Sequence, residues 1–299
     1  MLPANKYFLL FIILCLLKWQ TIFPQQIFST FFTRFAISDS SLTKTYFTKT
    51  NKLPKPQINT SKKLIVEYPA ILKGNEKESI EYVKMFSKRR RGYTIRMYTE
   101  GKKLLLNAAA ILKRHKLPEE LRVLLALESA YDSNAISIKG AVGYWQMIDA
   151  VAEEFELKFT QQPSEKALRK ILRNNNQRDS FLQKFNDEKD ERKNFVKATN
   201  AAALYLKDRF RNLDNNILLA VASYNVGVGN IWQIMKKIGK KHPTFWDIKA
   251  YLPAETNAYV MNFIALNVLF HNYDNFIKKK LNFNIELKFS DLEVVSLKN

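Results

Sequence analysis

Three leucines at helical spacing are followed, on the same helical stripe, by a glutamate. Leu121, Leu124 and Leu125 fall on one face of a predicted helix, and Glu128 is the next residue on that face. A charged carboxylate in a position that otherwise faces a core is costly. Burial there would raise its pKa and favour the protonated form, which is what a general acid needs. The alternative is that Glu128 only ends a helix near solvent.

Small and aromatic residues follow Glu128 after a polar loop. Residues 140–143 include two glycines, which allow the backbone to approach another backbone or a ligand closely. Tyr144, Trp145 and Gln146 come next and place aromatic faces and an amide near the candidate acid. Such groups suit sugar rings, which have apolar faces and hydroxyl edges.

Together these residues resemble the lytic transglycosylases with a goose-type-lysozyme-like domain, especially the membrane-bound murein transglycosylase D group. The similar segments are Glu128-Ser129, Gly143-Tyr144-Trp145-Gln146, Ala222-Ser223-Tyr224-Asn225-Val226-Gly227-Val228-Gly229 and Glu255-Thr256-Asn257-Ala258-Tyr259-Val260. Ser223 stands where the family usually has alanine. The resemblance covers residues 116–272 and carries weight because the segments occur in the family's order.

The resemblance implies cleavage of the β-1,4 bond between N-acetylmuramic acid and N-acetylglucosamine in peptidoglycan. In this mechanism Glu128 first protonates the glycosidic oxygen and then accepts the proton of the muramic C6 hydroxyl, which closes on C1. The product carries a 1,6-anhydro-muramic end, and no water has to be activated. Peptidoglycan glycan strands are then the expected partner, and we expect no cofactor.

Supporting roles follow from the same resemblance. Tyr224 is expected to hydrogen-bond and orient Glu128, and Ser137 to lie near the substrate's N-acetyl group. Gln146 and Asn225 are expected to bind sugar amides or hydroxyls, and Tyr259 to line the cleft or pack beneath Tyr224. For both tyrosines the alternative is core packing with a satisfied hydroxyl. The three histidines lack metal-ligand spacing, so we expect no metal site.

A second carboxylate would change the reaction, because hydrolytic glycosidases ordinarily use two. Asp132 lies four residues after Glu128 and would share its face if the helix continued. Asp before Ser-Asn more often turns the chain, and we expect that here. Glu165 or Asp187 could contribute only if their segment folded over the cleft. The alternatives are therefore a lysozyme-type muramidase, or an envelope protein that binds glycan without cleaving it.

Composition favours a mainly α fold: a lysozyme-like helical catalytic domain preceded by a helical region. Only 8 Gly and 9 Pro occur in 299 residues, too few for a sandwich of short strands with many tight turns. The expected organisation is a signal peptide or membrane anchor (1–24), a polar linker (25–72), a helical region (73–115), the catalytic domain (116–272) with a charged helical insertion (158–189), and a tail (273–299).

Charge and the N-terminal run bear on location and partners. The net charge of +20 suggests an anionic partner such as the cell wall or a membrane surface, although a solvated basic surface is the alternative. Few aromatic residues interleave the basic run 88–91, so we expect no nucleic acid. Lys6 precedes eleven apolar residues, which is typical of an export signal that can remain as an anchor; a buried N-terminal helix is the alternative. We expect a bacterial envelope protein located in the periplasm.

Overall fold

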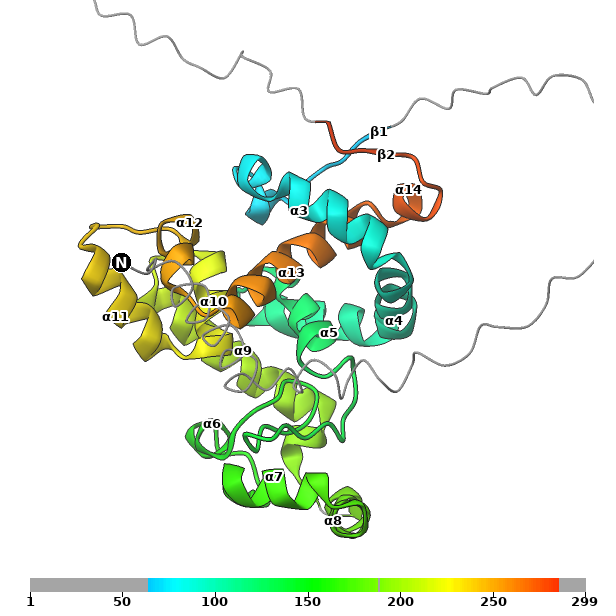
Figure 1. Ribbon diagram of the computed structural model, residues 1–299, viewed down its shortest axis with the longest axis vertical. Coiled ribbons are helices and arrows are strands. Elements are labelled where there is room, and N and C mark those ends of the chain that lie inside the picture. The colour runs from blue at the N-terminus through cyan, green and yellow to red at the C-terminus, as the bar shows by residue number, and fades with distance from the viewer. Residues whose placement is uncertain (1–63, 188, 285–299) are drawn as a thin grey trace, which may run out of the picture. The chain divides into compact units, whose positions relative to one another are not determined.

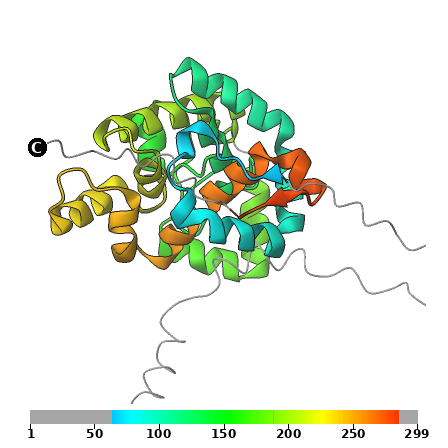
Figure 2. The ribbon, with the colours of Figure 1, turned by 90° about the horizontal axis from the view of Figure 1, so that it is seen from above.

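Two helices that are apolar on nearly all sides lie in the core of the fold. They are α10 (Ile217–Val226), whose residues 217–223 are all buried, and α13 (Ala254–His271), which buries most of its length between Val260 and Leu269. A helix that is apolar on every side must be surrounded by other elements. The two helices pack against each other, and α13 also packs against α3 (Glu76–Arg89), as Figure 2 shows with α13 in orange.

The computed structural model describes residues 64–187 and 189–284 (Figure 1). The remaining helices are α4 (Arg91–Arg114), α5 (Leu124–Glu128), α6 (Asp149–Glu154), α7 (Glu165–Arg173), α8 (Asn175–Asp187), α9 (Phe195–Asn212), α11 (Val228–Ile238), α12 (Phe245–Ile248) and α14 (Tyr273–Ile277). Short 3-10 helices are η2 (Ala70–Leu72), η3 (Glu119–Val123), η4 (Glu191–Lys193) and η5 (Lys249–Tyr251). None of the helices in these ranges is both long and apolar enough to cross a membrane.

The only β-sheet in the described ranges joins their first and last residues. Strand β1 (Leu64–Ile65) pairs in parallel with β2 (Leu281–Asn282), with Leu64 opposite Leu281. In the tail, the alternation of Phe283, Ile285, Leu287 and Phe289 predicts a strand. Strand β2 lies before it, and residues from 285 onward lie outside the described residues. The predicted N-terminal signal and most of the predicted linker also lie outside them.

The last part of the predicted linker is not a linker in the structure. Val66, Tyr68 and Leu72 are buried in the core, and the Tyr68 hydroxyl is hydrogen-bonded to the Ser79 hydroxyl (2.9 Å). Asn272 fixes this segment further, because its side chain exchanges hydrogen bonds with the backbone of Glu67 (2.6 and 3.2 Å). Because the segment is polar in composition, the sequence did not predict these three core positions.

The stripe of Leu105, Ala108, Ala109 and Leu112 predicts a helix over residues 104–114. Helix α4 begins thirteen residues earlier, at Arg91. This stretch contains Gly92 and Gly101, and glycine lowers helix propensity. Gly101 instead allows close packing, because a Cβ atom there would lie 2.2 Å from the ring of Tyr131. The Tyr131 hydroxyl donates a hydrogen bond to the carbonyl oxygen of Met97 (2.7 Å), which fastens the chain after α5 to α4.

For residues 243–252 the sequence predicts a loop, and this prediction is wrong. This segment contains α12 and η5, and α12 starts with a capping box between Thr244 and Asp247. The sequence also predicts one long final helix over residues 256–276. The structure divides it into α13 and α14 at Asn272, whose side chain donates back to the carbonyl oxygen of Val268 (2.8 Å). Local capping groups decide both helix boundaries.

Candidate active site

Glu128 is the last residue of α5, at the end of the leucine stripe. Leu121, Leu124 and Leu125 are fully buried in the core, whereas Glu128 is only half-buried. Helix α5 packs against α13, and the hydroxyl of Tyr259 on α13 donates a hydrogen bond to Oε1 of Glu128. The carboxyl group is therefore removed from most solvent and has a defined donor.

Burial is the main cause of the altered acidity of Glu128. It raises the pKa of the carboxyl group to about 7, while the hydrogen bond from Tyr259 lowers this pKa and the negative charge of Glu255 raises it. A group with a pKa near neutrality can donate a proton and later accept one. This is the requirement for a residue that acts first as acid and then as base.

The hydrogen bond to Glu128 comes from Tyr259, which corrects the expectation that Tyr224 makes it. The Tyr224 hydroxyl donates to the carbonyl oxygen of Trp145 (2.6 Å). Burial is the first cause that raises the pKa of both tyrosines well above its usual value, and the charge of Glu128 adds to it. Both hydroxyls are therefore protonated at neutral pH and act as donors.

Ser129 joins the end of α5 to the glycine-containing loop. Its side chain is fully buried, and its hydroxyl donates to the carbonyl oxygen of Tyr144 (2.9 Å). Tyr224 holds the neighbouring carbonyl of Trp145, so two side chains from different elements fix consecutive peptide groups of this loop. The sequence indicated Ser129 as part of a motif but not this function.

Gln146 stabilises the same loop from within. Its backbone is left-handed (φ 47°), and its Nε2 donates to the carbonyl oxygens of Ala135 (3.1 Å) and Gly143 (3.0 Å). The expected role of Gln146 in sugar binding stays a prediction. In this structure its amide nitrogen donates hydrogen bonds within the loop.

Ser137 and Asn225 have structural hydrogen bonds too. The Ser137 hydroxyl oxygen accepts from the backbone nitrogens of Lys139 (3.2 Å) and Ala141 (3.1 Å), while Oδ1 of Asn225 accepts from the hydroxyl of Thr256 (2.8 Å). None of these three bonds uses the hydroxyl hydrogen of Ser137 or the amide hydrogens of Asn225. These donors stay predicted substrate contacts.

Asp132 turns the chain, as predicted. Helix α5 ends at Glu128, and Oδ1 of the exposed Asp132 accepts from the backbone nitrogen of Asn134 (2.8 Å). The two carboxylates therefore do not share a helical face. The acid whose charge acts on Glu128 is Glu255, an exposed residue in the first turn of α13. The sequence indicated Glu255 as part of a motif but not this effect.

A buried arginine supports the loop from its other side. Arg192 is fully buried and forms salt bridges with Asp190 (2.7 Å) and Asp149 (2.6 Å). It also donates to the carbonyl oxygen of Met147 (3.3 Å), the residue after Gln146. No periodicity or motif marked this residue, because a lone arginine in a charged run is usually solvent-exposed.

The close contact between this arginine and the loop explains a glycine. A Cβ atom on Gly143 would lie 2.2 Å from the carbonyl oxygen of Arg192, and Gly143 has a φ of 77°. Both the space and the backbone conformation therefore require glycine. The resemblance indicated Gly143 as a motif position, and packing gives the physical reason.

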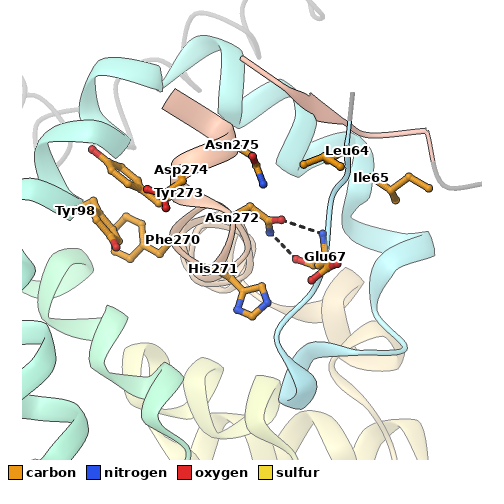
Figure 3. A pocket seen from close by; sticks show the side chains of 10 residues that line it. All are labelled: Leu64, Ile65, Glu67, Tyr98, Phe270, His271, Asn272, Tyr273, Asp274 and Asn275. Carbon is orange, nitrogen blue, oxygen red and sulfur yellow. Dashed lines mark hydrogen bonds between the residues drawn. The ribbon is translucent and has the colours of Figure 1, made fainter. Parts of the chain in front are cut away.

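One hollow in the described part of the chain lies away from Glu128 and is a poor candidate for the active site (Figure 3). It has a volume of about 610 Å³ at the C-terminal end of α13, where the rings of Tyr98 and Tyr273 stack 3.6 Å apart. His271, one of its lining residues, is twelve positions after Tyr259, which corresponds to roughly 18 Å along a helix. Its lining does not include Glu128. Within the described ranges no cluster of His, Cys, Asp and Glu could hold a metal ion.

Comparison with known families identifies the class of this domain. Residues 106–174 and 168–245 match the Transglycosylase SLT domain family. The region 106–245 is therefore similar to a transglycosylase SLT domain, and the expected mainly α, lysozyme-like fold is confirmed.

Two curated relatives show which transglycosylases this domain is similar to. They are the membrane-bound lytic murein transglycosylase D proteins of Escherichia coli strain K12 and of Escherichia coli O6:H1, each 30% identical over 166 residues. Each alignment covers 55% of this chain and 30% of the relative, so the chain spans less than a third of the length of these relatives. The expected resemblance to the murein transglycosylase D group is confirmed.

Proposed function

We propose that this chain is a peptidoglycan lytic transglycosylase that cleaves the β-1,4 bond between N-acetylmuramic acid and N-acetylglucosamine. The observation that carries the proposal is a single half-buried carboxyl group, Glu128, whose pKa is raised to about 7 and which accepts a hydrogen bond from Tyr259. The SLT domain match and the two murein transglycosylase relatives support the same reaction.

Glu128 acts twice in the proposed mechanism. Its proton passes to the glycosidic oxygen as the C1–O bond breaks, leaving a carboxylate that Tyr259 stabilises through its hydrogen bond. The carboxylate then takes the proton of the muramic C6 hydroxyl while that oxygen bonds to C1. Because the nucleophile belongs to the substrate, the attack is intramolecular and is favoured by proximity.

The supporting residues are proposed to hold the glycan beside this acid. The hydroxyl of Ser137 and the amide nitrogen of Asn225 are donors for the substrate's acetamido or hydroxyl groups. Gln146 and Tyr224 position the loop on which the substrate rests, through their bonds to Gly143 and Trp145. Tyr224 is thus a positioning residue for the loop.

A hydrolase with the same fold is the second candidate, and Glu255 is the residue it would need. Its charge acts on Glu128, but it is exposed and lies in the first turn of α13. A hydrolase would use such a second carboxylate to activate water. The residues and the comparisons favour the transglycosylase, and the reaction product separates the two candidates.

We also propose a cell-envelope location. The relatives are named membrane-bound, and the N-terminal run of Lys6 and eleven apolar residues fits an export signal that can remain as an anchor. A fusion of residues 1–30 to a reporter tests this proposal. A reporter that stays in the cytoplasm would exclude export, and one released in soluble form into the periplasm would exclude the anchor alone.

The role of Glu128 is tested by the variant Glu128→Gln on purified peptidoglycan. The amide is nearly isosteric but cannot donate the proton, so we expect turnover to fall by about a thousandfold or more. Glu154→Gln, an exposed substitution on α6, is the matched control and should keep parental activity. Near-parental turnover by folded Glu128→Gln protein would refute the proposed mechanism.

A further inference from the structure

Helix α7 presents a cationic face whose function the proposed reaction does not explain. Lys166, Arg169, Lys170, Arg173 and Asn174 line a hollow of about 480 Å³. The only acid in this helix is Glu165, and it pairs with Arg169 (2.6 Å). Among the described residues no salt bridge involves the other three cations, and all three are exposed.

The opposite face of α7 fastens the helix to the rest of the domain. Leu168 is fully buried, and its Cδ1 lies 3.8 Å from the Cβ position of Gly140. At 100° per residue Lys166, Lys170 and Arg173 point away from Leu168. Ser164 caps the helix by accepting from the backbone nitrogen of Ala167 (3.4 Å). The cations therefore project from a fixed support.

This arrangement is unfavourable for the isolated domain. Lys166 and Lys170 are four residues apart, and Lys170 and Arg173 are three apart, so each pair consists of neighbouring like charges on the helix surface. Such pairs destabilise a helix. A bound anion would remove the repulsion, and the hollow is lined by four cationic side chains and the amide of Asn174.

The helix is attached to the loop of the candidate active site. Gly140, whose Cβ position lies 3.8 Å from Cδ1 of Leu168, lies between Ser137 and Gly143. The segment between α6 and α7 is also fixed in place, because Oδ2 of Asp149 accepts a hydrogen bond from the backbone nitrogen of Gln162 (2.8 Å). A polymeric substrate that contacts this loop would extend beyond it, so its side groups can contact α7. Helix α7 packs against α8, as Figure 1 shows.

We propose that the cationic face of α7, formed by Lys166, Lys170 and Arg173, binds the carboxylates of the stem peptides on the glycan strand. The inference rests on the proposed function, since it assigns this face to the same polymer. An anionic membrane is the less suitable ligand: helices that lie on membranes insert their apolar face, and that face of α7 is packed against the protein.

Binding to purified peptidoglycan tests the proposal directly. The Glu128→Gln chain is mixed with sacculi that keep their stem peptides, or with sacculi from which an amidase has removed them, and the bound fraction is measured by sedimentation. The test variant Lys166→Gln/Lys170→Gln/Arg173→Gln is compared with Lys102→Gln/Lys103→Gln/Lys113→Gln, which removes three exposed cations from α4. Both triple variants lose the same charge.

We expect the α7 variant to bind peptide-bearing sacculi about tenfold more weakly than the α4 variant, because each exposed ion pair contributes modestly. On peptide-free sacculi the two variants should bind equally. Equal binding on peptide-bearing sacculi, or an unchanged difference on peptide-free ones, would overturn the proposal. So would an α7-dependent affinity for vesicles of phosphatidylglycerol that exceeds the affinity for sacculi. Turnover of the parent chain, measured separately, reports on the proposed function alone.

Discussion

At the scale of single residues, the acidity of Glu128 is the property from which the proposed chemistry follows. If Glu128 must begin the reaction protonated, kcat/KM should fall as pH rises through about 7, the value to which burial raises its pKa. The hydrogen bond from Tyr259 lowers this pKa, so Tyr259→Phe should move the alkaline limb to higher pH. Glu255→Gln removes a negative charge that raises the pKa and should move it to lower pH.

The pH–rate profiles of these variants check the assignment of the hydrogen bond. Tyr224→Phe is the informative control, because the Tyr224 hydroxyl donates to Trp145 and not to Glu128. It should lower activity through the loop with a smaller displacement of the limb than Tyr259→Phe. A limb that moves to lower pH in Tyr259→Phe would contradict the account of the site.

The same residue predicts a pH-dependent cost in stability. The folded-state pKa of Glu128 is about 7, above its ordinary 4.5. The unfolded chain therefore ionises first, so the stability linked to this group is full below about 4.5 and is lost as pH rises through about 7. Glu128→Gln should raise the unfolding free energy by up to about 3 kcal/mol at pH 8 and by little at pH 4.

Urea unfolding at the two pH values measures this difference. The exposed substitution Glu154→Gln should change the unfolding free energy by a similar, small amount at both. A Glu128→Gln variant that is destabilised at pH 8 would mean that the burial of the carboxyl group does not dominate its energetics.

At the scale of elements, the loop between α5 and α6 depends on its contact with Arg192. Gly143→Ala would place a Cβ atom 2.2 Å from the Arg192 carbonyl oxygen at a φ of 77°. Strain and overpacking should reduce the unfolding free energy by about 2–4 kcal/mol and lower turnover. Gly229→Ala is the matched control, because no atom lies within 4 Å of its Cβ position and it is helical. It should be neutral or stabilising by about 0.5 kcal/mol.

Denaturant midpoints and turnover of the two glycine variants give the comparison. Equal stability of Gly143→Ala and Gly229→Ala would show that the loop can move away from Arg192 without penalty. The loop would then not be the rigid support that the proposed function assigns to it.

The sequence could predict which segments form the main elements of the site but not how these elements pack together. The apolar stripe ending in Glu128 and the apolar segments of α10 and α13 have a periodicity or composition that depends only on local chemistry. Which tyrosine reaches Glu128 depends on how α13 packs against α5, and Tyr259 lies 131 residues away in sequence. Tyr224 and Tyr259 each lie in a segment that resembles a family motif, so no local sequence signal could tell which of them bonds to Glu128.

Tertiary contacts caused the other differences. Gly101 has the composition of a helix breaker, yet its missing side chain admits the ring of Tyr131. Arg192 has the composition of a surface residue, yet two buried or half-buried acids offset its charge. Asp190 is only two residues from Arg192, but Asp149 lies 43 residues from it. Tyr131 is likewise distant from Gly101 in sequence, and single-sequence patterns carry no information on such contacts.

At the scale of the whole molecule, the two proposed functions of the chain are cleavage and retention on the same polymer. The chain has a net charge of +20, and α7 places several of its cations on one face, where they can bind a particular ligand. Part of another basic run is structural, because the Arg91 guanidinium donates to the carbonyl oxygens of Phe276 and Ile277 (2.9 Å each). Local environment therefore distinguishes cations that hold the fold from those available to a ligand.

The central claim is that Glu128 works without an activated water. The most direct test is digestion of purified peptidoglycan in heavy-oxygen water, followed by mass spectrometry of the released glycans. The account predicts 1,6-anhydro-muramic ends that contain no solvent oxygen and are lighter by one water than reducing ends. A majority of reducing ends carrying the heavy oxygen would contradict it and would identify the chain as a lysozyme-type hydrolase.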